Sequence, residues 1–172
     1  MNQSSPGLKE AMRNVPSSVA LVTSRDEQGQ PHGMAASTVI SVSVDPPSML
    51  VAVNRTAGLY PVVQATKQLC INFLAQHQEH LLEAFSRSDM RAQRFTSPDW
   101  ADVHSPNSRR LPWLPCARAV VFAEVDQAVP YGTHTLFIAR VQEVALPKED
   151  AAQRPPLVWL GGRSASLAPA TV

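Results

Sequence analysis

Small hydroxyl-bearing residues and an arginine gather in one short stretch of the sequence, residues 33–55. Two runs rich in Val, Ile, Ser and Thr make up most of this stretch, and the turn-forming residues 45–47 (Asp-Pro-Pro) separate them. Small side chains let a flat polar ring approach the backbone, and a guanidinium offers a planar fork of donors to a phosphate. The stretch therefore suits a planar ring that carries a phosphate.

Two sets of residues would form such a site. Residues 35–38 (Ala-Ala-Ser-Thr) are small enough for backbone N–H and C=O groups to meet the edge of a ring. Arg55 would bind the phosphate, and the hydroxyls of Ser37, Thr38 and Thr56 would supplement it. Taken alone, residues 35–38 are more typical of an exposed strand at a tight bend, and Arg55 of a solvated arginine.

Strands must position most of these residues. Alternation and β-branched residues predict strands over 18–24, 32–43, 48–54, 68–74, 117–129, 134–146 and 157–160. A helix is predicted over 8–15, a helical turn over 58–66 and an amphipathic helix over 77–86. Residues 88–114 are predicted to form a long ordered loop, and the tail after Arg163 is expected to fray.

The predicted fold class is mainly β, an antiparallel barrel with a few flanking helices. The connections between strands are mostly too short for parallel crossovers, which favours antiparallel pairing. A small barrel has little room inside, so a large cofactor should bind on its outside or in a groove between two copies. We therefore expect a homodimer.

Composition narrows the class of protein. The 172 residues at 44% apolar content suffice for one filled core, and we expect a single domain over 1–172. The formal charge of +1 gives no electrostatic reason to expect nucleic acid or a membrane as partner. Because no apolar run approaches the roughly 20 residues that span a bilayer, we expect a cytoplasmic protein.

Common nucleotide and metal motifs are missing from the sequence. It contains neither GxGxxG nor GxxxxGK[ST], so a bound nucleotide would not use a Rossmann or Walker loop. Cys70 and Cys116 form no disulfide or zinc pattern, and His77 and His80 lack the spacing of a zinc protease motif. No metal site is predicted.

Six ordered segments together resemble the flavin reductase-like family of FMN-binding split barrels: LKEAMRNVPSSVALVTS, GMAASTVISVSVDPP, LVAVNR, LCINFLAQHQEHLLEAFS, GTHTLFIARVQEV and PLVWLGGR. The resemblance implies a split antiparallel β-barrel of Greek-key type. It also implies an NAD(P)H:flavin oxidoreductase that reduces FMN or FAD with NADH or NADPH. Such a reductase supplies reduced flavin to a separate flavin-dependent monooxygenase, and the family is dimeric.

The resemblance assigns cofactor-binding roles to residues that match the family's segments. These are Met34, Ala35, Ala36, Ser37, Thr38, Val53, Asn54, Arg55, Thr56, Ala84, Phe85, Ser86, Arg94, His134, Trp159 and Arg163. His134 is the expected catalytic residue, with the role of orienting the nicotinamide. The chain departs from the family pattern at Ala35 and Thr133, which replace a threonine and an aspartate, and at Ser164, which replaces an aromatic residue.

Simpler interpretations compete with several of these roles. His134 would otherwise be a turn histidine, Trp159 a core residue and Arg94 a member of a surface ion pair. A non-catalytic flavin-binding protein of the same barrel fold is the main alternative function. An oxidase similar to pyridoxamine phosphate oxidases is a further alternative on architecture alone.

Overall fold

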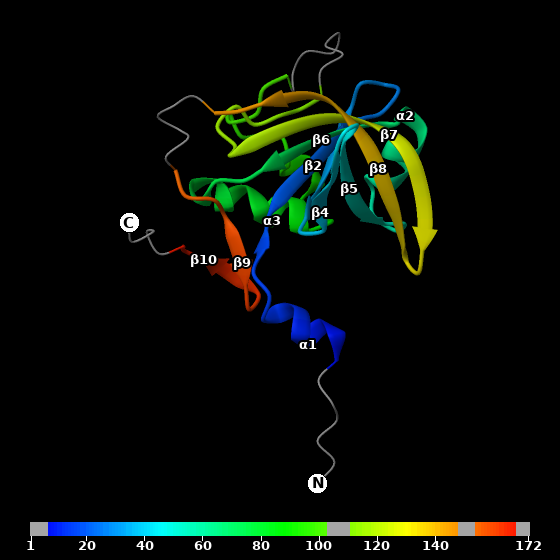
Figure 1. The fold of residues 1–172 in the computed structure, drawn as a ribbon. Helices are drawn as coiled ribbons and strands as arrows, with labels where there is room; N and C mark the ends of the chain where they lie inside the picture. The colour runs from blue at the N-terminus through cyan, green and yellow to red at the C-terminus, as the bar shows by residue number, and fades with distance from the viewer. Residues whose placement is uncertain (1–6, 103–110, 148–153, 168–172) are drawn as a thin grey trace.

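A seven-stranded antiparallel sheet forms most of the molecule in this computed structural model, which describes residues 7–102, 111–147 and 154–167 (Figure 1). Its strand order is β3-β2-β6-β7-β8-β5-β4. The strands are β2 (Ala20–Arg25), β3 (Pro31–Ala36), β4 (Val39–Val44), β5 (Pro47–Asn54), β6 (Gln68–Phe73), β7 (Ala119–Tyr131) and β8 (His134–Ala145). The predicted mainly β, antiparallel fold class is confirmed.

The two end strands of this sheet, β3 and β4, are consecutive in the chain. Only Ser37 and Thr38 separate them, and the backbone N–H of Ala52 on β5 donates to the Thr38 carbonyl at 3.2 Å. The prediction of one continuous strand over 32–43 is therefore wrong. The chain leaves its pairing with β2 after Ala36 and pairs with β5 from Val39, and this change of partner divides the strand.

Two hydrophobic cores lie on opposite faces of the central strands. One, the barrel core, includes Val22, Val51 and Phe137. The other, the outer core, includes Leu21 and Phe85 and lies on the opposite face. Strand β2 contributes to both cores, so its apolar residues Ala20, Leu21 and Val22 follow one another without alternation. Its polar residues Thr23, Ser24 and Arg25 are buried as well.

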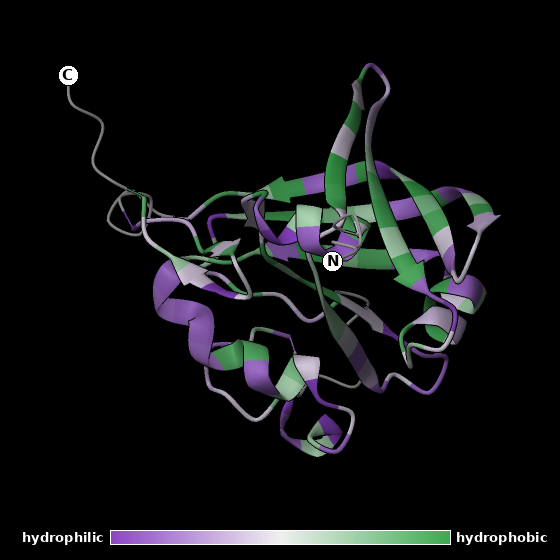
Figure 2. Cartoon of the chain, turned by 90° about the horizontal axis from the view of Figure 1, so that it is seen from below, coloured by the Kyte–Doolittle hydropathy of each residue, from purple (hydrophilic) through white to green (hydrophobic). Residues whose placement is uncertain are grey.

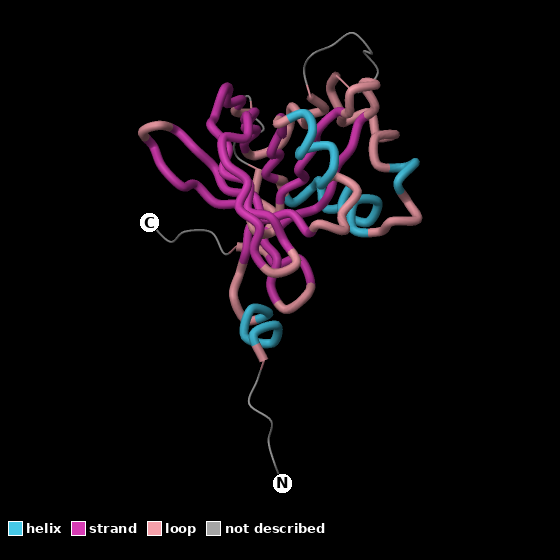
Figure 3. Tube along the Cα trace, turned by 90° about the vertical axis from the view of Figure 1, so that its right-hand side faces the viewer, coloured by secondary structure: helices cyan, strands magenta, loops and turns pink. Residues whose placement is uncertain are grey.

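Short helices cover the outer core and flank the barrel. They are α1 (Leu8–Arg13), α2 (Tyr60–Thr66), η1 (Gln76–Leu81), α3 (Leu82–Ser86) and η2 (Arg91–Gln93). The predicted helix over 77–86 is present, but its first half is the 3-10 helix η1. Figure 3 shows α1 projecting away from the strands, while the other helices gather on one side of them.

A second, three-stranded sheet holds the C-terminal segment. It consists of β1 (Ser17–Ser18), β9 (Val158–Leu160) and β10 (Arg163–Ala165), in the order β1-β9-β10. The expected fraying directly after Arg163 is therefore wrong, because Ser164 and Ala165 pair with β9. Gly161 and Gly162 form the two-residue hairpin loop, and their φ values of 65° and 85° are of the sign that such turns require.

Hydrophobic residues are concentrated along the strands of the large sheet, as Figure 2 shows by hydropathy. Within the described ranges, none of the helices has the length and apolar character needed to cross a membrane.

Candidate functional site

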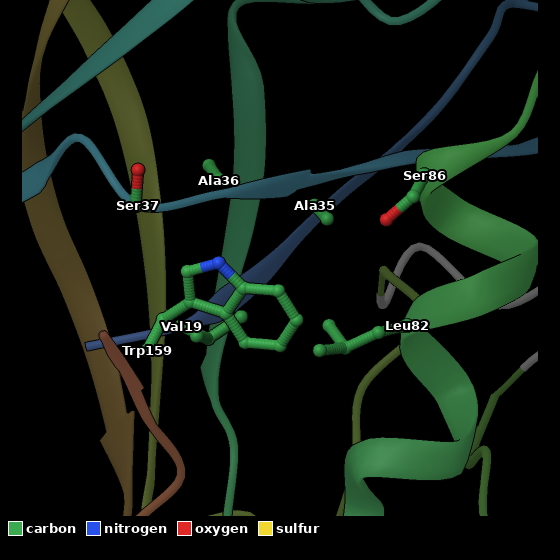
Figure 4. A pocket seen from close by; sticks show the side chains of 7 residues that line it. All are labelled: Val19, Ala35, Ala36, Ser37, Leu82, Ser86 and Trp159. Carbon is green, nitrogen blue, oxygen red and sulfur yellow. The ribbon is translucent and has the colours of Figure 1, made fainter. Parts of the chain in front are cut away.

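A pocket of about 220 Å³ lies where the end of β3, helix α3 and strand β9 meet (Figure 4). Its lining residues are Val19, Ala35, Ala36, Ser37, Leu82, Ser86 and Trp159. Figure 4 shows the Trp159 ring facing Leu82 across the pocket, with Ala35 and Ala36 on the strand beside them and the Ser86 hydroxyl directed inward. The pocket thus combines an aromatic surface, small side chains and two hydroxyl groups.

Separate elements fix the walls of this pocket. Trp159 is held in the middle of the small sheet, since it pairs with Ser17 on one side and Ser164 on the other. Ala35 and Ala36 pair with Leu21 and Ala20 at the buried start of β2. The aromatic wall therefore depends on the C-terminal hairpin, and the shelf of small residues depends on the main sheet.

Five of the residues predicted from the sequence to bind a cofactor line this pocket: Ala35, Ala36, Ser37, Ser86 and Trp159. Two further lining residues, Val19 and Leu82, were not predicted. Both are buried apolar residues in runs that are typical of core packing. Their types alone gave no signal of a site, whereas their position in the fold does.

Helix α3 presents its predicted residues in different directions. Ser86 faces the pocket, whereas the Phe85 ring is buried in the outer core, where it packs against Phe95 and Trp100 at centroid distances of 5.4 and 5.5 Å. Ala84 is half-buried, and its carbonyl accepts a hydrogen bond from Arg94 at 2.9 Å. Phe85 therefore positions α3 and would contact a ligand only through its backbone.

Arg94 ties α3 to strand β3. Its guanidinium also donates to the carbonyls of Gly33 at 2.8 Å and Arg87 at 3.1 Å, and it lies 5.7 Å from the centroid of the Phe85 ring. Burial, with a smaller contribution from the charge of Arg91, lowers the pKa of Arg94. The surroundings of Arg94 are thus backbone carbonyls and an aromatic ring, not the surface ion pair considered from its sequence.

A second group of predicted residues lies around the turn after β5. The Asn54 side-chain oxygen accepts hydrogen bonds from the backbone N–H of Thr56 at 3.0 Å and from its hydroxyl at 2.9 Å. Arg55 is exposed and donates to the Gly132 carbonyl in the turn between β7 and β8. These bonds give the Asn-Arg-Thr turn a fixed shape before any ligand binds.

His134 belongs to the same group. It begins β8, pairs with Asn54 and is half-buried. Its Nδ1 lies 2.9 Å from the hydroxyl of Thr133, the residue that replaces the family's aspartate. Thr133 thus supplies a hydrogen-bond partner for the imidazole at the position of the missing carboxylate.

Strand β5 connects the pocket residues at the end of β3 with the residues around the turn after β5. Thr38 is hydrogen-bonded to Ala52, and Asn54, two residues further along β5, pairs with His134 on β8. Adjacent strands lie roughly 4.8 Å apart, so two strand spacings separate the end of the shelf from β8, on the order of 10 Å.

The remaining predicted residues lie at the margins of these groups. Val53 is fully buried in the barrel core, and Met34 packs against the same core, so both would meet a ligand through the backbone. Arg163 is exposed on β10, beside the Gly-Gly turn. The structure thus brings five of the sixteen predicted residues into one pocket. The others lie around the turn after β5, in supporting positions or on β10.

Residues 12–168 match the model of the flavin reductase like domain. An actinorhodin polyketide dimerase from Streptomyces coelicolor is 33% identical over 160 residues, 93% of this chain and 85% of the relative. The reductase component of an FADH(2)-dependent resorcinol hydroxylase from Rhizobium sp. is 34% identical over 134 residues, 77% of this chain and 73% of the relative. An FMN reductase (NADH) RutF from Klebsiella pneumoniae is 31% identical over 153 residues, which cover 89% of this chain and 88% of the relative.

A solved structure also resembles this fold. The flavin reductase PheA2 in its native state superposes with a TM-score of 0.74 at 28% identity, over 93% of this chain and 95% of that one. The relatives differ in the activities that their names state, so the reaction must be argued from the site. The match over most of the length is sufficient for the family: this chain belongs to the flavin reductase-like domain family.

Proposed function

We propose that this chain is an NAD(P)H:flavin oxidoreductase that reduces FMN or FAD and supplies the reduced flavin to a separate monooxygenase. The observation that carries the proposal is the convergence of Ala35, Ala36, Ser37, Ser86 and Trp159 on one pocket. Family membership supports a flavin as the ligand. The relatives named as an NADH-dependent FMN reductase and as a hydroxylase's reductase component support the reaction and the kind of partner.

The pocket has the chemistry that a flavin ring requires. Its alanines leave the backbone accessible, the hydroxyls of Ser37 and Ser86 can donate or accept hydrogen bonds, and the indole of Trp159 offers a flat surface for stacking. Bound flavin would supply the acceptor for a hydride from NADH or NADPH. Ala35 lacks the hydroxyl that the family pattern has at this position. Backbone N–H and C=O groups would therefore make the hydrogen bonds to the edge of the ring there.

Positioning is the main contribution of the protein to such a reaction. Hydride transfer requires the two reacting carbons at roughly 3 to 3.5 Å, and it needs no acid or base at the moment of transfer. His134 would orient the nicotinamide. Because the Thr133 hydroxyl engages Nδ1 at 2.9 Å, Nε2 is the ring atom left to meet the nicotinamide.

The turn after β5 is suited to the anionic part of the flavin. Arg55 is exposed and already fixed at one N–H by the Gly132 carbonyl, and a guanidinium carries five such donors. The Asn54 side chain fixes the backbone of Thr56 beside it. We assign Arg55 the role of phosphate partner, with Thr38 and Thr56 as neighbouring hydroxyls.

The assembly is part of the same proposal. A pocket of about 220 Å³ is smaller than the roughly 300–1,000 Å³ of most ligand sites, which supports a second copy as an additional wall. Exposed apolar side chains on the outer face of β4, such as Ile40 and Val44, support a homodimer.

We further propose a single domain over 1–172 and a cytoplasmic location, where NADH and NADPH are regenerated.

A donor-by-flavin activity matrix tests the reaction. NADH and NADPH are each combined with FMN, FAD or no flavin, with and without the purified protein. We expect oxidation of at least one donor to require both flavin and protein. Binding of FMN or FAD without oxidation of either donor would instead establish the alternative, a non-catalytic flavin-binding protein. Absence of both binding and oxidation would contradict the proposal altogether.

A further inference from the structure

Tyr131 is a large aromatic residue on the surface beside His134. It is the last residue of β7 and is 78% exposed. Among residues 7–102, 111–147 and 154–167, its phenol ring has no hydrogen-bond partner and no contact with another aromatic ring. The ring belongs to neither core, so its surface is open to a ligand or a partner.

The strand register places Tyr131 and His134 on one face of the main sheet. His134 pairs with Tyr131 on β7 and with Asn54 on β5. Residues directly opposite each other on antiparallel strands share a face, with Cβ atoms roughly 4.5–5.5 Å apart. The next residues along, Thr135 and Val53, are buried, so the row of Asn54, His134 and Tyr131 faces away from the barrel core.

An apolar row borders this one on the same face. Leu136, two residues further along β8, pairs with Val129 on β7 and with Ala52 on β5. Val129 is exposed and Leu136 is half-buried. A flat ring that lies against His134 would therefore meet apolar side chains next to the imidazole.

The hairpin turn that follows Tyr131 is bonded to β5 and lies at the periphery of the molecule (Figure 1). The φ of Gly132 is 55°, the sign that the first position of a type II′ turn requires. The backbone N–H of Arg55 donates to the Thr133 carbonyl at 3.0 Å, and its guanidinium donates to the Gly132 carbonyl. The backbone of Tyr131 is thus fixed beside His134 before any ligand binds.

We propose that Tyr131 binds the hydride donor, with its phenol ring stacked on the face of the nicotinamide that is turned away from the flavin. The inference rests on the proposed function, in which His134 orients this nicotinamide. Strand β8 lies between β5 and β7, and β5 leads to the pocket through the bond between Ala52 and Thr38. Tyr131 therefore lies on the side of His134 that is opposite the pocket.

The reaction itself makes such a ring useful. When the donor gives up a hydride, the electron pair leaves with the hydrogen for the flavin, and the nicotinamide ring becomes positively charged. The face of a tyrosine ring attracts a positive charge. Tyr131 would therefore bind the oxidised ring and stabilise the charge that develops during transfer.

Three substitutions of Tyr131 separate stacking from simple apolar contact. Tyr131→Ala removes the ring, Tyr131→Leu keeps an apolar side chain without the ring, and Tyr131→Phe keeps the ring without the hydroxyl. Calorimetry measures the dissociation constants of NAD⁺ and of oxidised nicotinamide mononucleotide, which lacks the adenosine, with each protein saturated with FMN. The matched control is Val144→Ala, because Val144 is an exposed residue at the far end of β8.

We expect Tyr131→Ala and Tyr131→Leu to raise both dissociation constants about three- to tenfold, and Tyr131→Phe to leave them within about twofold. The control and the affinity for FMN should not change. A leucine variant that binds as the wild type does would overturn the stacking. A loss for NAD⁺ but not for the mononucleotide would also overturn the proposal, because it would place the tyrosine on the adenine.

Steady-state oxidation of NADH and NADPH distinguishes failure of this inference from failure of the proposed function. If the wild type oxidises a donor and Tyr131→Ala keeps the same KM, kcat and NAD⁺ affinity, the inference fails and the function stands. If Tyr131 contributes to NAD⁺ binding but neither donor is oxidised, the function fails and the binding role stands. A wild type that neither binds nor oxidises a nicotinamide nucleotide contradicts both.

Sedimentation provides the last test, because an exposed aromatic residue can also serve an interface between copies. Strand β4, which carries the exposed apolar residues of the proposed homodimer, is separated from β7 by β5 and β8. Tyr131→Ala should therefore sediment as the wild type does. A change in its oligomeric state would assign Tyr131 to the interface and contradict the proposal.

Discussion

Arg55 and Arg94 are both arginines that the sequence places near a ligand, yet their surroundings differ. Arg94 is half-buried and donates to three carbonyls, so much of its hydrogen-bonding capacity serves to hold α3 against β3. Arg55 is exposed and donates to Gly132. The sequence matched both to family positions but gave no information on these bonds, which depend on the tertiary fold.

Substitution of Arg55 tests its role as phosphate partner. Arg55→Ala should weaken FMN binding by about 1.5–3 kcal/mol, the range for a charge-assisted hydrogen bond. Riboflavin, which lacks the phosphate, should bind as before. The measurement is a fluorescence titration, with Arg140→Ala as the control because Arg140 is likewise exposed and pairs with Asp126. An unchanged FMN affinity would remove Arg55 from the site.

At the scale of elements, the hydrophobic pattern predicted the main strands and two of the helices well. It did not predict the break at Ser37 and Thr38. The alternation of apolar and polar residues indicates which side chains are buried, but not which strand is the pairing partner. The strand over 157–160 was predicted, and it is present as β9, but β10 was missed although Gly161 and Gly162 are a recognised two-residue turn signal. Strand β10 has only three residues, which is too short for a periodic pattern.

The contact between β3 and α3 gives a prediction at this scale. A Cβ atom on Gly33 would lie 2.6 Å from the Phe85 ring and 3.2 Å from the Val22 carbonyl, and both are buried. Gly33→Ala should therefore destabilise the protein by about 1–3 kcal/mol through overpacking. Chemical denaturation measures this, with Gly7→Ala as the control because nothing lies within 4 Å of its Cβ position. Equal stability of the two variants would show that the β3–α3 contact is looser than described.

At the scale of the whole molecule, the barrel presents an apolar outer face. Ile40 on β4 pairs with Leu50 on β5, which pairs with Ile138 on β8, so the three side chains form one row across the sheet. Ile40 is 56% exposed, and Val44 at the end of β4 is 88% exposed. The sequence predicted the barrel and its small interior, but only the register shows that these residues are adjacent.

A homodimer that uses this face should be sensitive to a buried charge. We expect the wild type to sediment as a dimer and Ile40→Glu to sediment as a monomer or to dissociate at higher concentration, because an unpaired carboxylate is costly to bury. Leu146→Glu is the control, as Leu146 is 73% exposed just beyond the far end of β8. A wild type that is monomeric, or an Ile40→Glu variant that dimerises normally, would contradict this interface.

The pocket beside Ala35 and Trp159 is the proposed flavin site, and a titration of the purified protein with FMN and FAD measures flavin binding directly. We predict saturable quenching of flavin fluorescence for the wild type. Ala35→Leu, which fills the shelf with an apolar side chain, should weaken the affinity at least about tenfold with little loss of stability. No quenching by the wild type, or equal affinity of the two proteins, would contradict the claim.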